Sequence, residues 1–211
     1  MQNVLIACAG VAFAGSAVAQ VQVFTDRAAW EAAVGDFSTE DFNDINPFVF
    51  ADQQTLDTGL LQITRDGSAN GADGVLEIEP GGNFGDLDGT NFISGETGAS
   101  PHDTVRISAS SGLPVVAFGA DWFSPFSGDG IALQAGDDVV LLDSITGFNQ
   151  GFVGIIATSG SFSEIQIIGT ADAVSFQELW SADNLSFAVI PAPASAALLG
   201  LGGLAASRRR R

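Results

Sequence analysis

The chain has 211 residues, of which 25 are acidic and seven are basic, and its net charge is −18. The last four residues are all arginines, so the rest of the chain carries only Arg27, Arg65 and Arg106 against all 25 acidic residues. Nucleic-acid binding draws its affinity from phosphates neutralised by lysine and arginine, so this charge excludes nucleic acid as a partner. The same acidity fits either a solvated, salt-tolerant exported surface or a set of oxygen ligands for Ca²⁺.

The N-terminus has the pattern of a signal peptide, which we assign to residues 1–19. The apolar segment 4–18 leads into Ala17-Val18-Ala19, where Ala17 and Ala19 form the small-x-small pattern that signal peptidase cuts, here before Gln20. The alternative is lipidation of Cys8, which ends a bacterial lipobox-like Leu-Ile-Ala-Cys but follows only seven residues. Cys8 is the single cysteine, so the mature domain has no disulfide and must be held together by apolar packing.

The body, residues 20–189, is long enough for one domain with a hydrophobic core. We predict one short helix in it, over Asp26–Val34, with Thr25 as the N-cap and Gly35 at its end. Trp30 is the expected anchor of this helix in the core.

After the helix, helical periodicity gives way to short apolar or alternating segments separated by Gly, Asp, Asn, Ser and Pro. Alternation over Leu60–Arg65 and Glu164–Ile168 predicts strands with one buried face, whereas the apolar run 114–120 suits a central strand covered on both faces. The pattern indicates an all-β, antiparallel sandwich or barrel. The predicted strands are Asp36–Phe42, Gly59–Arg65, Val75–Glu79, Thr104–Ser108, Val115–Trp122, Ile131–Gln134, Val139–Asp143, Gly151–Ala157, Glu164–Ile168, Ala173–Glu178 and Asn184–Val189.

Two segments rich in Gly, Asn and Asp, residues 70–74 and 81–89, are predicted to be loops. The run 86–91 resembles the start of an EF-hand loop. Its glycine stands at the wrong position, however, and Thr97 occupies the place of the closing glutamate. We therefore interpret it as an ordinary loop.

The last 22 residues, 190–211, form a tail in three parts: a proline pair, an uncharged apolar run over 194–206, and a block of arginines. The tail resembles a PEP-CTERM sorting signal, which the membrane enzyme exosortase reads. Ala192 stands where that motif usually has glutamate. The resemblance implies an exported protein that is anchored in the membrane until it is processed, the alternative being a plain C-terminal anchor. The motif residues are Pro191, Ala192, Pro193, Arg208, Arg209, Arg210 and Arg211.

The body also resembles jelly-roll domains of the carbohydrate-binding-module type, through the helix with its Trp, Glu40-Asp41-Phe42, the segment 117–123, and the segment 183–187. The resemblance implies a two-sheet sandwich whose first and last strands are neighbours. In that case Glu40 or Asp41 would meet Asp183 and Asn184 in one structural Ca²⁺ site, because Ca²⁺ takes carboxylate and amide oxygens. The alternative is that these side chains face water.

Sugar binding has candidates where aromatic side chains stand near polar loop residues. Trp122, Phe126 and Asp129 are the main ones, with Phe123 in the same segment and Trp180 near Asp183 as further aromatics. Aromatic rings stack on sugar rings while polar groups take the hydroxyls. The alternative is that the aromatics fill the core, and the 16 phenylalanines without a tyrosine favour that role for most of them.

Catalytic signatures are missing from the sequence. The single histidine, His102, stands in a predicted loop, and there is no G-x-S-x-G elbow or phosphate-binding Gly-Lys motif. A pair of carboxylates could still serve a glycoside hydrolase. We expect a non-enzymatic surface or matrix protein that binds exopolysaccharide, with Ca²⁺ as a candidate cofactor. The alternatives are a structural coat component without a small ligand and a secreted hydrolase.

Overall fold

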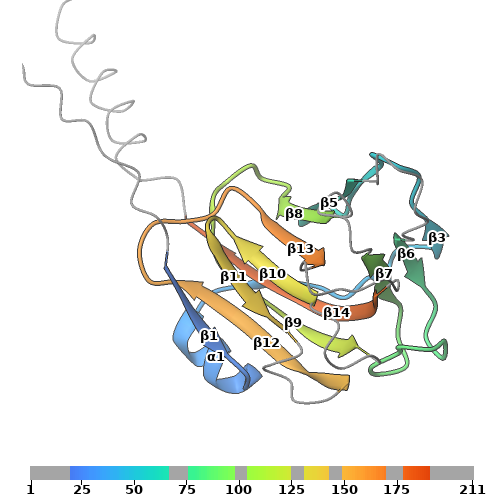
Figure 1. The fold of residues 1–211 in the computed structure, drawn as a ribbon, viewed down its shortest axis with the longest axis horizontal. Coiled ribbons are helices and arrows are strands. Elements are labelled where there is room, and N and C mark those ends of the chain that lie inside the picture. The colour runs from blue at the N-terminus through green and yellow to red at the C-terminus, as the bar shows by residue number, and fades with distance from the viewer. Residues whose placement is uncertain are drawn as a thin grey trace, which may run out of the picture.

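The computed structural model describes residues 20–66, 76–97, 104–124, 131–142, 149–169 and 178–190. These residues form one helix and two antiparallel β-sheets, which pack face to face (Figure 1). The predicted antiparallel sandwich with one short helix is therefore confirmed. The predicted signal peptide and the tail beyond Ile190 lie outside the described residues. Within the described ranges, no helix has the length and apolar character needed to cross a membrane.

The larger sheet has eight strands, with β9 and β14 near its centre. The first half of β14 pairs with β7 and its second half with β2, so these two strands share one edge of β14. The register between β14 and β9 shifts between Asp183 and Ser186. In spatial order the strands are β1 (Val21–Phe24), β12 (Asn149–Ala157), β9 (Val115–Ser124), β14 (Glu178–Val189), β7 (Phe92–Thr97), β6 (Leu76–Glu79) and β3 (Phe48–Val49), with β2 (Ser38–Glu40) beside β14.

The smaller sheet has six strands, and each pairs antiparallel with its neighbours. In spatial order they are β11 (Asp138–Leu141), β10 (Ile131–Ala135), β13 (Ile165–Gly169), β8 (Thr104–Ala109), β5 (Leu61–Asp66) and β4 (Thr55–Asp57).

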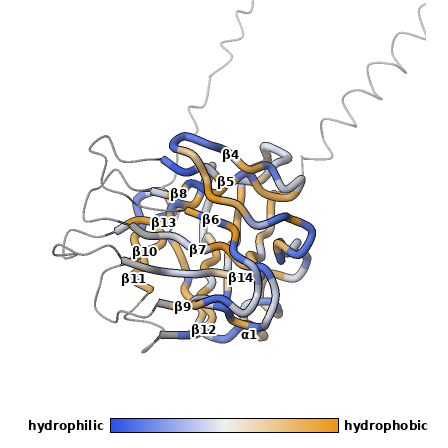
Figure 2. The backbone as a smooth tube through the Cα atoms, turned by 90° about the vertical axis from the view of Figure 1, so that its right-hand side faces the viewer, coloured by the Kyte–Doolittle hydropathy of each residue, from blue (hydrophilic) through white to orange (hydrophobic). Residues whose placement is uncertain are grey.

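The main core lies between the two sheets and is built by alternation along each strand. Leu61 and Ile63 are buried while Gln62 and Thr64 between and beside them are partly exposed, as the alternating pattern predicts. Trp122 and Trp180 meet in this core, with ring centroids 6.0 Å apart. Figure 2 shows the resulting pattern, with hydrophobic segments along the strands and hydrophilic segments in many of the connections.

The helix α1 (Arg27–Val34) covers the other face of the larger sheet, which we call the outer face. Trp30 is fully buried there, edge-on to Phe152 at 5.8 Å, and its Nε1 donates to the carbonyl of Ile155. A Cβ on Gly154 would lie 2.4 Å from Cδ1 of Trp30, so only glycine lets the indole lie this close to β12. The first part of β9, residues 115–120, is thus covered on both faces, as its apolar sequence predicts.

Several predicted boundaries need correction. The N-cap of α1 is Asp26 and not Thr25, because the Asp26 carboxylate accepts the N–H of Ala29 at 2.7 Å. Strand β2 ends at Glu40, before Phe42 takes a left-handed φ of 57°. Of the predicted strand Ala173–Glu178, only Glu178 is described, and it is the first residue of β14, which also includes the predicted strand Asn184–Val189.

Candidate functional site

The outer face of the larger sheet carries polar side chains between α1 and a long connection that we call the 80–91 loop, residues Pro80 to Asn91. On β9 and β14 the outward-facing residues alternate with residues of the main core, such as Trp122 and Trp180. Asp121 pairs directly with Asp183, and Phe123 pairs with Ser181. Residues directly opposite on antiparallel strands point to the same face, so the pairing brings together side chains from two segments that are distant in sequence.

The 80–91 loop is ordered by its own aspartate. The carboxylate of Asp86 accepts the backbone N–H groups of Gly82 at 2.6 Å, Gly89 at 2.7 Å and Asp88 at 3.0 Å. The hydrogen bonds from Gly89 and then Gly82 hold the pKa of Asp86 below its usual range. The segment is a loop, as its composition predicts, with a defined shape.

The loop lies directly on β14 at Gly85. The hydroxyl of Ser181 donates to the Gly85 carbonyl oxygen at 2.6 Å, and a Cβ on Gly85 would lie 2.7 Å from the Ser181 Oγ. Gly85 also has a φ of 94°, a region that side chains disfavour. Phe92 at the end of the loop is fully buried, although it belongs to neither of the two main apolar clusters.

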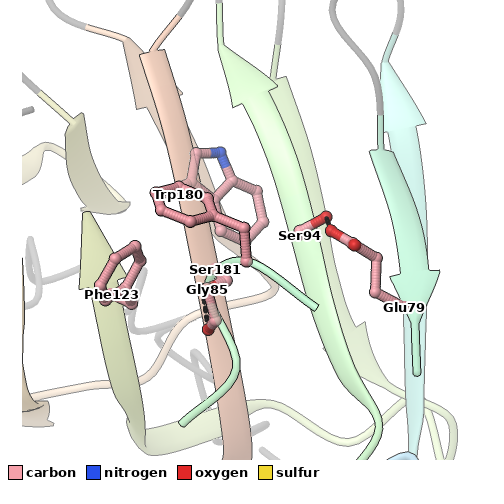
Figure 3. Close-up of a pocket in the computed structure, with 7 residues that line it drawn as sticks. Glu79, Gly85, Ser94, Phe123, Trp180 and Ser181 are labelled. Carbon is pink, nitrogen blue, oxygen red and sulfur yellow. Dashed lines mark hydrogen bonds between the residues drawn. The ribbon is translucent and has the colours of Figure 1, made fainter. Parts of the chain in front are cut away.

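A pocket of about 190 Å³ opens beside this contact, and we call it the aromatic pocket. Phe84 is 70% exposed and stands edge-on to Phe123, with ring centroids 5.4 Å apart and an angle of 88°. On another side Ser94 donates to Glu79 at 2.5 Å (Figure 3). The pocket thus has an apolar wall and a polar side. Its lining residues are Glu79, Phe84, Gly85, Ser94, Phe123, Trp180 and Ser181.

A second pocket of about 200 Å³, the acidic pocket, lies on the same face. It combines two carboxylates, two side-chain amides and the ring of Phe152. The amide of Asn184 faces both carboxylates, at 3.4 Å from Asp121 and 3.5 Å from Asp88. The lining residues are Leu87, Asp88, Asp121, Gln150, Gly151, Phe152 and Asn184.

Asp183 lies buried next to the acidic pocket, with no exposed surface. One of its oxygens accepts the N–H of Asn184 at 2.6 Å and the other accepts the Thr90 hydroxyl at 3.3 Å. Burial, and after it the charges of Asp88 and Asp121, raises the pKa of Asp183 to about 7. This carboxyl therefore changes its protonation near neutral pH.

Arg27 of α1 neutralises part of this acidity. Its guanidinium donates two hydrogen bonds to the Asp121 carboxylate, at 2.9 and 3.3 Å, and a third to Ser186 Oγ at 3.1 Å. It also lies over the ring of Phe152, 4.6 Å from the ring centroid. The helix is thereby fixed to the sheet next to the acidic pocket.

The residues of the predicted Ca²⁺ site make separate hydrogen bonds in the structure. Asn184 lines the acidic pocket and Asp183 is buried beside it. Glu40 pairs with the core residue Leu185, and its carboxylate accepts the N–H of Phe42. Asp41 is exposed and accepts the N–H of Asn43. Among the described residues, no three His, Cys, Asp or Glu side chains are arranged to hold a metal ion.

The predicted sugar-binding residues are also distributed differently. Trp122 is 2% exposed, and its Nε1 donates to the carbonyl of Val153, so it is a core residue. Phe126, Asp129 and His102 lie outside the described residues, as do the predicted cleavage and sorting residues. Phe123 and Trp180, the secondary candidates, both line the aromatic pocket.

Phe84, Glu79, Ser94 and Gln150 were not predicted from the sequence. One signal pointed to Phe84: it is a large apolar residue within a run of Gly, Asn and Asp. Glu79, Ser94 and Gln150 carry no local signal, because strand pairing alone places them. Comparison with models of protein families and with curated proteins found no match to this chain.

Proposed function

We propose that this chain is an exported surface or matrix protein whose sandwich domain, of jelly-roll type, binds a sugar unit of an extracellular polysaccharide without cleaving it. The observation that carries the proposal is the aromatic pocket, where Phe84 and Phe123 stand beside the Glu79–Ser94 pair. Small-molecule sites typically combine such an apolar wall with a few fixed polar groups.

The exposure of Phe84 supports a binding role. Removing a phenyl ring from water is favourable, so a ligand that covers Phe84 would be stabilised by its burial. The ring is 70% exposed at the mouth of the pocket and is therefore accessible to such a ligand. The loop that carries it is held by Asp86 and by the Ser181–Gly85 hydrogen bond, so little ordering is required on binding.

The export part of the proposal rests on the two ends of the sequence. Signal peptidase would remove residues 1–19, and exosortase would process the tail from Pro191 onward. Mass spectrometry of the protein recovered from the cell surface tests this. The proposal expects an N-terminus at Gln20 and no Arg208–Arg211 block, whereas an intact Arg211 on surface-located protein would contradict it.

A second candidate function, glycoside hydrolysis, is favoured by one observation, the raised pKa of Asp183 next to Asp121. A catalytic acid must come within hydrogen-bond distance of the glycosidic oxygen. Asp183 is fully buried under Thr90, so no substrate oxygen reaches it without displacement of the loop. We therefore propose binding without turnover, and release of reducing sugar from a bound glycan would support the hydrolase instead.

A glycan array followed by calorimetry on the full chain tests the binding proposal. Phe84→Ala should weaken binding of the best array ligand by about fivefold to tenfold, since loss of a stacking ring costs on the order of 1 kcal/mol. Val49→Ala is the matched control, because Val49 is an apolar residue that is 59% exposed on the edge strand β3, and it should leave affinity unchanged. If no sugar binds, the proposal is wrong, and the result favours a structural coat component without a small ligand.

A further inference from the structure

The aromatic pocket and the acidic pocket are neighbours on one face. Strand β9 contributes Asp121 to the acidic pocket and Phe123 to the aromatic pocket. Residues two apart on a strand point to the same side, about 7 Å from each other. The two pockets therefore share this strand as a common floor.

The neighbouring strand β12 continues the same arrangement. Gln150 pairs directly with Phe123, and Phe152 pairs with Asp121. Side chains opposite each other in an antiparallel pair have Cβ atoms about 5 Å apart. Gln150 is exposed and lines the acidic pocket. An amide in this position is available to a ligand that already contacts Phe123.

The 80–91 loop lies over the outer face of the sheet and lines both pockets. Phe84 and Gly85 line the aromatic pocket, while Leu87 and Asp88 line the acidic pocket. The hydrogen bonds of Asp86 order the loop between these two pairs, so one ordered segment lines both pockets.

The pocket volumes also argue for joint use. The pockets measure about 190 and 200 Å³, and each alone is below the roughly 300–1,000 Å³ of a typical ligand site, whereas the two together reach that range.

We propose that the two pockets are consecutive subsites for a sugar chain of at least two rings, and that the acidic pocket accepts neutral or amino sugars and rejects uronic acids. This inference rests on the proposed function. The selectivity follows from charge: a uronate carboxylate in the acidic pocket would face Asp88, which is exposed, and Asp121. Arg27 offsets the charge of Asp121 through their ion pair, so the repulsion comes mainly from Asp88.

The test titrates the full chain with oligosaccharides of one to four units from three families: neutral glucans, amino-bearing chitosan oligomers and uronate-bearing alginate oligomers. We expect at least one neutral or amino family to bind about tenfold more tightly as a disaccharide than as a monosaccharide, and the alginate series to bind weakest. Gln150→Ala should remove most of the gain between one and two rings, about fivefold, whereas Phe84→Ala should weaken monosaccharide and disaccharide binding alike. Gln22→Ala is the matched control, since Gln22 is an exposed glutamine on β1 of the same sheet.

The outcomes separate the inference from the proposed function. Monosaccharide binding that depends on Phe84 but shows no gain with length, or alginate binding equal to that of the other families, would overturn the subsite inference alone. An unchanged length dependence in Gln150→Ala would also overturn it. Absence of binding to every family would overturn the proposed function and the inference with it.

Discussion

The Ser181 hydroxyl donates a 2.6 Å hydrogen bond to the carbonyl oxygen of Gly85, and this contact fixes the 80–91 loop on strand β14. Ser181 is 2% exposed, so its hydroxyl has little access to water as an alternative partner. The position of Phe84, the residue before Gly85, depends on this contact. Loop shape and ligand binding should therefore respond together when the contact is changed.

Substitution of Gly85 tests that dependence. Gly85→Ala adds backbone strain at a φ of 94° and a Cβ that would lie 2.7 Å from Ser181 Oγ. Gly82→Ala is the matched control, because Gly82 has a φ of 91° but open space around it. By urea unfolding we expect a cost of about 1–2 kcal/mol for Gly82→Ala and about 1–3 kcal/mol more for Gly85→Ala. Equal costs would show that the loop does not lie tightly on Ser181.

Stability should depend on pH through Asp183. Its pKa rises from an ordinary 3.8 to about 7 in the folded protein. Between these values the folded state holds one more proton than the unfolded state, so the free energy of unfolding falls as pH rises and the loss is complete above about pH 7. The expected loss is on the order of 2–4 kcal/mol, since the carboxyl is fully buried.

Asp183→Asn should remove this slope, because the amide keeps the size of the side chain and cannot ionise. Asp52→Asn, at an exposed aspartate, should leave the slope unchanged. Asp57 and Asp86 act in the opposite sense: their pKa values are lowered, so the stability they add is lost as pH falls below 3.8. Denaturation curves of Asp183→Asn and the unchanged protein that stay parallel from pH 5 to pH 8 would contradict this role for Asp183.

The contacts of Arg27 predict that its bond to Asp121 stabilises the fold more than its contact with Glu31 does. Arg27 binds Asp121 through two hydrogen bonds, whereas Glu31 lies 3.8 Å away on the same helix. Arg27→Ala should lower the free energy of unfolding by about 1–3 kcal/mol, because the Asp121 carboxylate loses the guanidinium that donates two hydrogen bonds to it. Glu31→Gln should change it by less than about 0.5 kcal/mol, as exposed helix pairs do. Similar effects of the two substitutions in thermal or urea unfolding would refute the assigned anchoring role.

The sequence was informative wherever local pattern decides structure. Gly35 ends α1 as predicted, although Asp26 and not Thr25 is its N-cap, and the alternation around Ile63 and Ile167 marks strands with one buried face. Strand β7 was not predicted, because Gly95 in its middle weakens the strand pattern. The structure supplies the reason for that glycine: a Cβ there would lie 2.6 Å from Cζ2 of Trp180. Strands β1, β3 and β4 were also missed, and two of these have only two or three residues.

Most of the candidate site could not be predicted from local sequence pattern. Trp122 and Phe123 are adjacent in an apolar strand, and only the pairing of β9 with β12 and β14 shows that Trp122 faces the core and Phe123 the pocket. A shift of one residue in that register would exchange the two roles. Glu79 and Ser94 reach the same pocket from β6 and β7, which sequence alone does not place beside β14.

The most direct test of the aromatic pocket is an NMR titration of the ¹⁵N-labelled full chain with the tightest array ligand. Sugar binding in the pocket predicts that the largest amide shifts occur at Phe84, Ser94, Phe123 and Ser181, with Gln150 added when the ligand has two rings. Shifts confined to the outer side of the smaller sheet, around Gln134 and Gln166, with the 80–91 loop unchanged, would contradict it.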